Sequence, residues 1–307
     1  MTTPAATPAT ALPPTEQRLA DSRDLDLLPS LDVLMLLNDQ DRVAVDATRA
    51  ALPQLAALVD EAAARFRRGG TVHYFGAGTS GRLGVLDAAE LLPTFNLEPG
   101  RVTAHIAGGD AAIVHAVENA EDSAEEGATA AVSLGPDDVA IGLAASGNTP
   151  YVGGALRAAR AQGAFTALIS SNPQARLIPL ADIHVLLDTG AEVLTGSTRL
   201  KAATAEKLVL NGFSTALMVA VGRTWSNLMV SMVATNEKLR ERTVRILREA
   251  TGLDDEEARA LLTLTDGDLK TAIVSNLATA DAADSRAALA SANGSVRGAL
   301  ALLTTGA

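Results

Sequence analysis

The sequence predicts an α/β protein in which a parallel five-stranded sheet is flanked by helices on both faces, a doubly wound arrangement. The chain has 307 residues, of which 48% are hydrophobic, so it can bury a large core. Five short apolar runs alternate with stretches of helical periodicity, which is typical of parallel sheets. The runs comprise residues 71–75, 102–106, 138–143, 165–170 and 183–187.

The residues before the first run predict a tail followed by helices. Residues 1–14 contain mainly Ala, Thr and Pro without apolar periodicity, so we expect a disordered tail there. Residues 15–70 have a helical pattern, with Ser30 as an N-cap and Gly69-Gly70 as the stop signal. We expect these helices to cover the sheet or a partner chain.

Two long helical patterns and a group of short ones follow the fifth run. The first extends from Leu200 to about Val221. The second starts after Gly222 and reaches Arg248. The Leu- and Ala-rich residues 253–303 predict a small subdomain of the three-helix kind. The expected domains are a tail (1–14), N-terminal helices (15–70), a central ligand-binding domain (71–240) and a C-terminal helical subdomain (241–307).

Charge and composition exclude several functional classes. The formal net charge of −11 argues against nucleic acid or an anionic membrane as the main partner. The chain has no Cys, and its four His lack the spacing of metal ligands, so we expect no disulfide, thiol nucleophile or metal site. No apolar run approaches the roughly 20 residues of a membrane span, and the N-terminus lacks a signal-peptide pattern, so we expect a cytoplasmic protein.

The most informative motif is a glycine-rich loop after the first apolar run. Residues 76–82 read Gly-Ala-Gly-Thr-Ser-Gly-Arg and open a helical pattern. Glycines let backbone amides approach a ligand, the helix adds its positive N-terminal end, and Thr79 and Ser80 offer hydroxyl donors. The loop therefore predicts an anion site. Two alternatives stay open: a tight turn without a ligand, and the GxGxxG fingerprint of dinucleotide-binding proteins.

Two further hydroxyl-rich turns offer the same chemistry. Residues 144–150 follow the third run, and residues 195–199 precede the helical run that starts at Leu200. Each turn alone is typical of a helix cap, but ligands of parallel sheets bind in the loops beyond the carboxyl ends of the strands. We therefore expect the loops to contribute to one site. The candidate binding residues are Gly78, Thr79, Ser80, Arg82, Ser146, Gly147, Asn148, Thr149, Ser197, Thr198 and Lys201.

The side chains of these loops favour a phosphosugar over a dinucleotide. A dinucleotide site needs an acidic residue after the second strand, and Asp110 is available there, so that alternative stays open. A pyrophosphate, however, is held mainly by backbone amides, whereas this chain offers hydroxyl groups in all three loops. Several hydroxyls that converge on one compact anion fit a phosphomonoester better.

Longer motifs carry a resemblance to a known family. They are distributed over most of the chain beyond the tail and comprise residues 76–90, 106–109, 116–122, 195–201, 227–230 and 234–239. In these motifs the chain resembles the sugar isomerase (SIS) domain proteins, and among them the N-acetylmuramic acid 6-phosphate etherases. It departs from the family pattern at Leu19, Ala89, Leu91-Leu92 and Asn148.

The resemblance implies an enzyme of cell-wall sugar recycling, a carbon–oxygen lyase that cleaves the lactyl ether of N-acetylmuramic acid 6-phosphate. Elimination and hydration would yield N-acetylglucosamine 6-phosphate and D-lactate without a metal or organic cofactor. By motif, the resemblance implies Glu90 and Glu121 as the catalytic pair. Glu90 is then the acid at the lactate oxygen and Glu121 the base at C2.

The spacing within the first motif predicts a homodimer with shared sites. Glu90 follows Ser80 by ten residues, about 15 Å along a helix, which is longer than a hexose phosphate bridges. We therefore expect Glu90 to serve a phosphosugar bound by the other chain. Two other functions stay open: a non-catalytic phosphosugar sensor of the glucokinase regulatory protein type, and an aldose-ketose phosphosugar isomerase. Paired glutamates disfavour both, because neither function needs an acid at a C3 leaving group.

Overall fold

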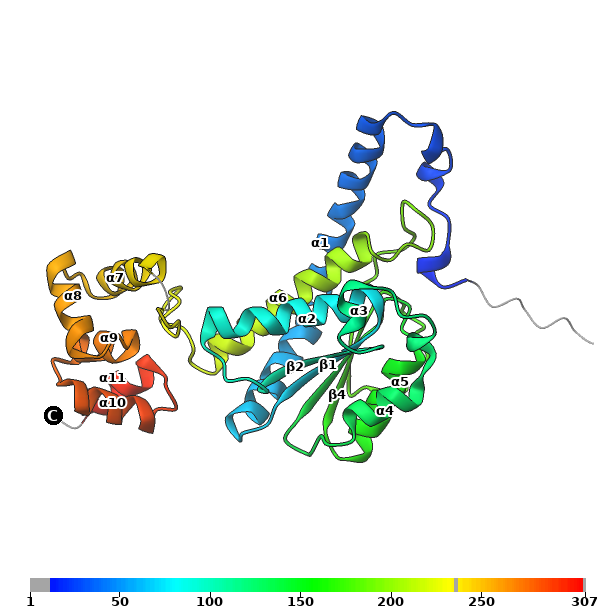
Figure 1. Cartoon of the computed structure of the whole chain (residues 1–307). Coiled ribbons are helices and arrows are strands. Elements are labelled where there is room, and N and C mark those ends of the chain that lie inside the picture. Colours follow the sequence, from blue (N-terminus) through cyan, green and yellow to red (C-terminus); the bar gives the residue numbers. More distant parts are fainter. Residues whose placement is uncertain (1–11, 235–236, 306–307) are drawn as a thin grey trace, which may run out of the picture. The chain divides into compact units, whose positions relative to one another are not determined.

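Five strands form the predicted sheet. The structure is a computed structural model that describes residues 12–234 and 237–305. The strands are β1 (Val72–Gly76), β2 (Val102–Ile106), β3 (Val139–Leu143), β4 (Phe165–Ser170) and β5 (Ile183–Leu186). They run in the order β2-β1-β3-β4-β5, with β3 paired in parallel to β4 and β4 to β5 (Figure 1). The α/β prediction is confirmed, and each predicted strand ends within one residue of the observed one.

One face of the sheet is covered by α4 (Ala124–Ala131) and α5 (Pro150–Ala161), which lie against each other (Figure 1). Two glycines allow this close approach. A Cβ atom on Gly127 would strike the carbonyl oxygen of Tyr151, and Gly154 has the same relation to the backbone of α4. The two helices therefore contact each other through their backbones, and larger residues at either glycine would separate them.

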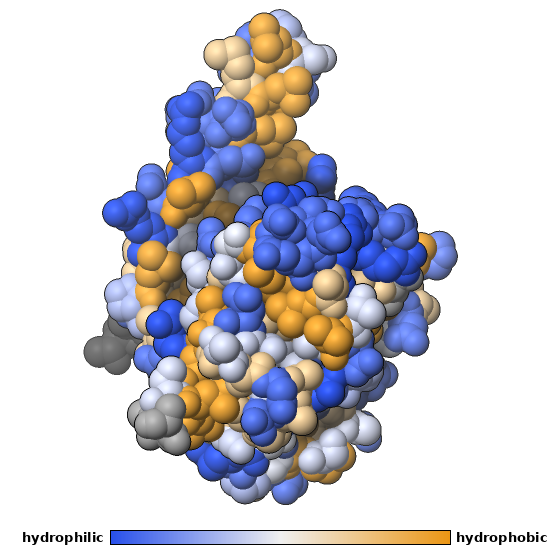
Figure 2. All heavy atoms as spheres, turned by 90° about the vertical axis from the view of Figure 1, so that its left-hand side faces the viewer, coloured by the Kyte–Doolittle hydropathy of each residue, from blue (hydrophilic) through white to orange (hydrophobic). Residues whose placement is uncertain are grey.

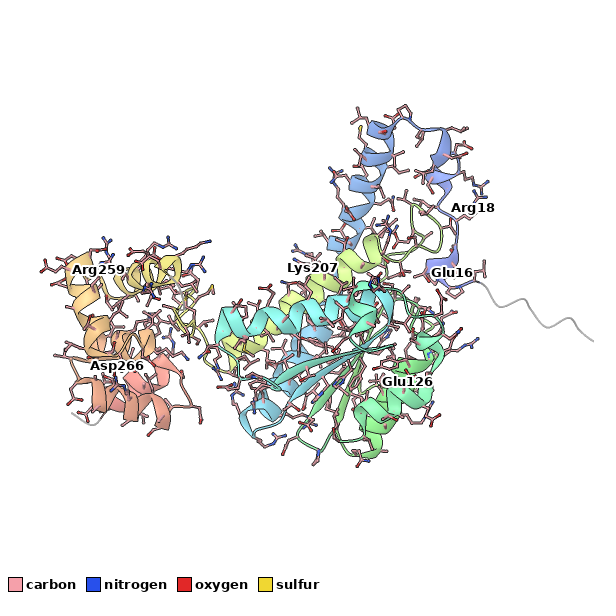
Figure 3. The ribbon with its side chains drawn as sticks, in the orientation of Figure 1. Glu16, Arg18, Glu126, Lys207, Arg259 and Asp266 are labelled. Carbon is pink, nitrogen blue, oxygen red and sulfur yellow. The ribbon has the colours of Figure 1, made fainter. Side chains whose placement is uncertain are left out.

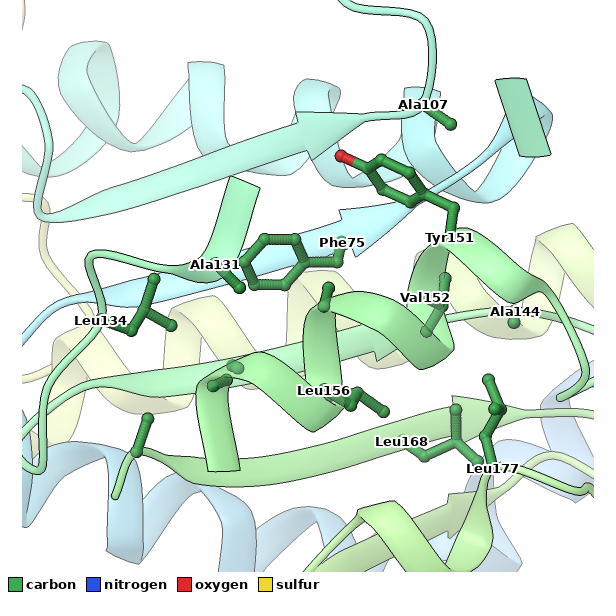
Figure 4. Close-up of a cluster of buried hydrophobic side chains, with 14 of the residues drawn as sticks. Phe75, Ala107, Ala131, Leu134, Ala144, Tyr151, Val152, Leu156, Leu168 and Leu177 are labelled. Carbon is green, nitrogen blue, oxygen red and sulfur yellow. The ribbon is translucent and has the colours of Figure 1, made fainter. Parts of the chain in front are cut away.

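A core of aliphatic and aromatic side chains lies between α5 and the sheet. Figure 4 shows Phe75 from β1, Leu168 from β4, and Tyr151, Val152 and Leu156 from α5 in this cluster. All five side chains are buried. These buried contacts hold α5 against the sheet, and the predicted ligand-binding loops follow strands of this sheet.

The opposite face of the sheet packs against α2 (Gly78–Phe95). Tyr74 neighbours Phe75 in β1, so its side chain points to the other face, because side chains alternate along a strand. A Cβ atom on Gly84 of α2 would lie 3.2 Å from the Tyr74 Cβ and 3.0 Å from a methyl group of Leu143. Helices thus cover both faces, as a doubly wound sheet requires.

The N-terminal region is helical, as the sequence predicts. Residues 1–11 of the predicted tail lie outside the described residues. The long helix begins at Ser30 and ends directly before the Gly69-Gly70 stop signal. The elements are the short 3-10 helices η1 (Pro14–Glu16), η2 (Ala20–Ser22) and η3 (Leu25–Leu27), followed by α1 (Ser30–Arg67).

The predicted helical pattern between Gly222 and Arg248 is wrong for residues 223–234, which form no regular helix. Ser226 has a φ of 51°, a left-handed conformation that interrupts a right-handed helix. The apolar spacing that suggested a helix has another cause. Val230 and Met232 are buried in the core of the C-terminal helices. Residues 235–236 of the motif at 234–239 lie outside the described residues.

The C-terminal subdomain contains more helices than the three predicted for it, so that prediction is wrong. Asp254, Asp268 and Asp281 each accept a backbone N–H at the start of a helix, and these N-caps divide the region into short segments. The helices are α7 (Glu237–Thr251), α8 (Asp255–Leu264), α9 (Leu269–Ala278), α10 (Ala282–Ser291) and α11 (Val296–Thr305).

The chain groups into two compact units, each assembled from several stretches. The first comprises Met1–Leu58, His73–Val85 and Ala104–Leu210, and the second comprises Val59–Val72, Leu86–Thr103 and Asn211–Ala307. The division into domains 1–14, 15–70, 71–240 and 241–307 stays a prediction. In the described parts of both units, no helix has the length and apolar character needed to cross a membrane. The remaining elements are α3 (Ala111–Val114), η4 (Ala120–Asp122), η5 (Ile178–Leu180) and α6 (Lys201–Ala220).

Candidate active site

The loops that follow β1 and β3 border a cavity of about 280 Å³. The strand order places β1 beside β3, and the connections that leave these two strands diverge to opposite sides of the sheet. Parallel sheets bind ligands at such a reversal point. The predicted site residues that line the cavity are Gly78, Thr79, Ser80, Glu121, Ser146, Thr149 and Thr198.

The first loop turns so tightly that α2 starts at the cavity. A Cβ atom on Gly76 would lie 2.7 Å from the backbone nitrogen of Gly81, so the turn requires glycine there. Because α2 begins at Gly78, the amides of Thr79 and Ser80 lie in its first turn, where N–H groups have no partner within the helix. These amides and the two hydroxyl groups form a cradle that suits an anion.

The second loop owes its shape to Gly147 and Asn148, which do not line the cavity. Gly147 has a φ of 66°, and a Cβ atom on it would strike the side chain of Ala175. Asn148 donates its backbone N–H to the Ser146 hydroxyl (3.2 Å) and accepts the backbone N–H of Arg176 at Oδ1 (2.9 Å). Asn148 therefore fastens this loop to the segment after β4, and Ser146 and Thr149 of the loop line the cavity.

A carboxylate stands beside the two loops. Glu121 belongs to the short helix η4, which follows a left-handed turn at Asn119. The Thr149 hydroxyl donates a hydrogen bond to Glu121 Oε1 at 2.9 Å. Both side chains line the cavity. The predicted base therefore lines the same cavity as Thr79 and Ser80.

The loop before α6 and the N-terminal segment complete the cavity wall. Thr198 and Gly196 come from that loop, and Glu16 comes from η1. Oε2 of Glu16 lies 3.5 Å from the position of a Cβ atom on Gly196, and Figure 3 shows Glu16 beside this loop. The sequence did not indicate Glu16, because nothing in the helical pattern of residues 15–70 distinguishes it as a site residue.

Comparison with known proteins establishes the family. A family model described as the glucokinase regulatory protein N-terminal SIS domain matches residues 54–160. The N-acetylmuramic acid 6-phosphate etherase of Thermobifida fusca is 52% identical over 261 residues, which cover 85% of this chain and 86% of the relative. The chain belongs to the N-acetylmuramic acid 6-phosphate etherase family. The etherase of Klebsiella aerogenes is 49% identical over 93% of this chain and 96% of its own length.

Among solved structures, the fold is similar to that of a phosphoheptose isomerase from Francisella tularensis. The TM-score is 0.51 at 18% sequence identity, and the similarity covers 62% of this chain and 98% of the isomerase. At this identity the similarity bears on the fold alone. The etherase relatives do not favour the phosphosugar sensor that the sequence left open.

Lys201 does not reach the cavity in this member of the etherase family. The residue is 3% exposed, and its Nζ donates a hydrogen bond to Oε1 of Gln40 on α1 at 2.6 Å. The buried Glu192 carboxylate accepts the backbone N–H groups of Lys201 (3.3 Å) and Ala202 (3.0 Å), which caps the start of α6. Burial lowers the pKa of Lys201. The structure therefore gives Lys201 a role in joining α1 to α6.

Three further predicted residues lie outside the cavity lining. The Arg82 guanidinium donates to the backbone carbonyl oxygens of Ile113 (3.0 Å) and His115 (3.5 Å), so it braces the segment before η4. Ser197 is half-buried in the loop before α6. Glu90 is exposed on α2 and is not among the residues that line the cavity.

Glu206 is a second acidic residue that the sequence did not indicate. It belongs to α6, and its Oε2 accepts a hydrogen bond of 2.7 Å from the Ser80 hydroxyl. The one sequence signal that could have pointed to it is that a glutamate interrupts the apolar helical run that starts at Leu200. Burial raises the pKa of Glu206 to about 7, and the hydrogen bond from Ser80 opposes only part of that shift.

Proposed function

We propose that this protein is an N-acetylmuramic acid 6-phosphate etherase, a carbon–oxygen lyase that converts its substrate and water into N-acetylglucosamine 6-phosphate and D-lactate. One observation carries the proposal. In a chain 52% identical to a relative named for this activity, an anion cradle and the Glu121 carboxylate line the same cavity. A cytoplasmic location and a reaction that needs no metal or organic cofactor belong to the same proposal.

The 6-phosphate is the group that the cradle suits. Thr79 and Ser80 in the first turn of α2 line the cavity together with Ser146 and Thr198, and these residues offer backbone N–H and hydroxyl donors. Such donors match the several acceptor oxygens of a phosphomonoester, and the helix N-terminus stabilises its negative charge. A local site of this kind offsets the repulsion from a chain whose net charge is −11.

The chemistry needs a base and an acid, because an ether oxygen is a poor leaving group. Opening of the sugar ring to the aldehyde makes the proton at C2 acidic, and Glu121 removes it. The C3–oxygen bond then breaks, its electron pair stays with the lactate oxygen, and Glu90 protonates that oxygen. Water adds to C3 of the unsaturated aldehyde, and a proton returns to C2. The hydrogen bond from Thr149 holds Glu121 in place for the first step.

Glu90 reaches such a site most readily from a second chain. It lies ten residues beyond Ser80 on α2, about 15 Å along the helix axis. Its side chain is exposed, so it is accessible to a partner. We therefore assign the acid to the other chain of a homodimer, with each cavity completed by its partner.

The start of α1 offers a surface for that partner. Leu31, Leu34 and Met35 are 66%, 61% and 57% exposed, and their spacing places them on one side of the helix. Hydrophobic side chains gather at the top of the view in Figure 2, where the N-terminal end of α1 lies. Exposed apolar patches of this kind mark interaction surfaces. A second copy of the chain is the occupant that would also deliver Glu90.

The proposal is tested by a D-lactate assay. The full chain is expected to release D-lactate from N-acetylmuramic acid 6-phosphate. With unphosphorylated N-acetylmuramic acid, kcat/KM is expected to fall by about 10²-fold or more, because two or more charge-assisted hydrogen bonds are lost. Formation of a ketose phosphate without lactate would instead identify an isomerase. Absence of lactate with folded protein would exclude the etherase function.

A further inference from the structure

A buried carboxylate lies directly behind the phosphate cradle. Glu206 is 3% exposed, and its Oε2 accepts a hydrogen bond from the Ser80 hydroxyl, with 2.7 Å between the two oxygens. Its Oε1 is also buried and has no hydrogen-bond partner among the described residues. Ser80 itself lines the cavity from the first turn of α2. Glu206 is therefore linked to the cavity by its hydrogen bond with the Ser80 hydroxyl.

The charged groups on neighbouring elements do not neutralise this carboxylate. On α6 itself, the Lys201 ammonium is hydrogen-bonded to Gln40, and on α2 the Arg82 guanidinium donates to backbone carbonyls. On α1, Asp41 accepts a hydrogen bond from the Thr204 hydroxyl and adds no positive charge. Across the cavity, Glu121 and Glu16 are acidic as well.

The protonation state of Glu206 decides what Ser80 offers to the cavity. A serine hydroxyl has one proton and two lone pairs. When Glu206 is ionised, the Ser80 hydroxyl donates its hydrogen bond to the carboxylate, and Ser80 presents only lone pairs to an incoming phosphate. When Glu206 is protonated, its own O–H donates to the Ser80 oxygen, and the Ser80 proton is free to turn toward the phosphate.

We propose that Glu206 is a positioning residue that couples phosphosugar binding to the uptake of one proton, because only its neutral form lets Ser80 donate to the phosphate group. This inference rests on the proposed phosphosugar site. Burial supports it, because the pKa of Glu206 is raised to about 7, which places the change of state near neutral pH. Binding should therefore weaken as the pH rises above 7.

The test compares wild type with Glu206→Gln in binding N-acetylglucosamine 6-phosphate, the product, by titration calorimetry from pH 6 to pH 8.5. The second ionisation of the phosphosugar, with a pKa of about 6, affects both proteins alike. Relative to the variant, the Kd of wild type is expected to rise about tenfold from pH 6 to pH 8. Two buffers with different ionisation enthalpies should also reveal about one extra proton taken up by wild type at pH 8.

Two controls separate this role from a structural one. Glu249→Gln makes the same substitution at an exposed residue of α7 and should retain the wild-type profile. Glu206→Gln should unfold at pH 8 at a temperature no lower than wild type. The reason is that a raised folded-state pKa costs stability as the pH rises from 4.5 to about 7, and glutamine has no charge to bury.

The outcomes are distinguishable. A wild-type profile that steepens above pH 7 while Glu206→Gln stays flat supports the inference. Parallel profiles in the two proteins, with equal proton uptake, would overturn it and leave the phosphosugar site intact. Failure of wild type to bind the phosphosugar at any pH would overturn the proposed site and this inference together.

Discussion

Glu121→Gln is expected to lower the kcat of lactate release by about 10²- to 10⁴-fold, the contribution typical of a general base. Glutamine keeps the size of the side chain and still accepts the hydrogen bond from Thr149, but it cannot remove the proton at C2. Binding of N-acetylglucosamine 6-phosphate should therefore stay within about threefold of wild type. Lactate release measured beside calorimetric binding separates the two effects.

Glu125→Gln is the matched control for this experiment. Glu125 lies four residues further along the chain, is exposed on α4 and does not line the cavity. Its replacement should leave kcat within about twofold, as expected for surface substitutions. If Glu121→Gln retained wild-type kcat, Glu121 would not be the base, and another group would have to remove the C2 proton.

Mixed dimers of Glu121→Gln and Glu90→Gln are expected to recover activity that neither variant shows alone. A homodimer with shared sites joins Glu121 of one chain to Glu90 of the other. A mixed dimer then has one site with both glutamates and one with neither. Random pairing at equal concentrations should give about a quarter of wild-type lactate release, because half of the dimers are mixed and half of their sites are intact.

The same experiment distinguishes the alternative arrangement. If both glutamates acted within one chain, no site in a mixed dimer would contain the intact pair, and activity would stay at the level of the separate variants. Two affinity tags purify the mixed species, and light scattering verifies that it is a dimer. A chain that is monomeric by light scattering at assay concentrations, yet active, would exclude the shared site.

The sheet was predictable because its strands are short, apolar and separated by turn residues, so local sequence suffices to define them. The glycine loop was predictable for the same reason, since Gly76 and Gly81 meet a steric requirement within one turn. The helix predicted over residues 223–234 is wrong because the apolar residues of this segment pack into a tertiary core. Val230 and Met232 are buried in that core without helical backbone.

The site was harder to predict than the fold, because its contacts join distant parts of the chain. The hydrogen bond from Ser80 to Glu206 spans 126 residues, and the contact of Lys201 with Gln40 spans 161. Contacts between residues so far apart in the chain produce no periodic pattern in the sequence. The resemblance named Lys201 as part of a motif, but only the structure shows its side chain directed to α1 and away from the cavity.

The most direct test of the etherase function follows the oxygen of water through the reaction. The full chain is incubated with N-acetylmuramic acid 6-phosphate in ¹⁸O-labelled water, and both products are analysed by mass spectrometry. Elimination followed by hydration breaks the bond between C3 and the ether oxygen. We therefore expect one ¹⁸O atom at C3 of N-acetylglucosamine 6-phosphate and none in the D-lactate. Label in the lactate, or no lactate at all, would contradict the proposed function and its mechanism.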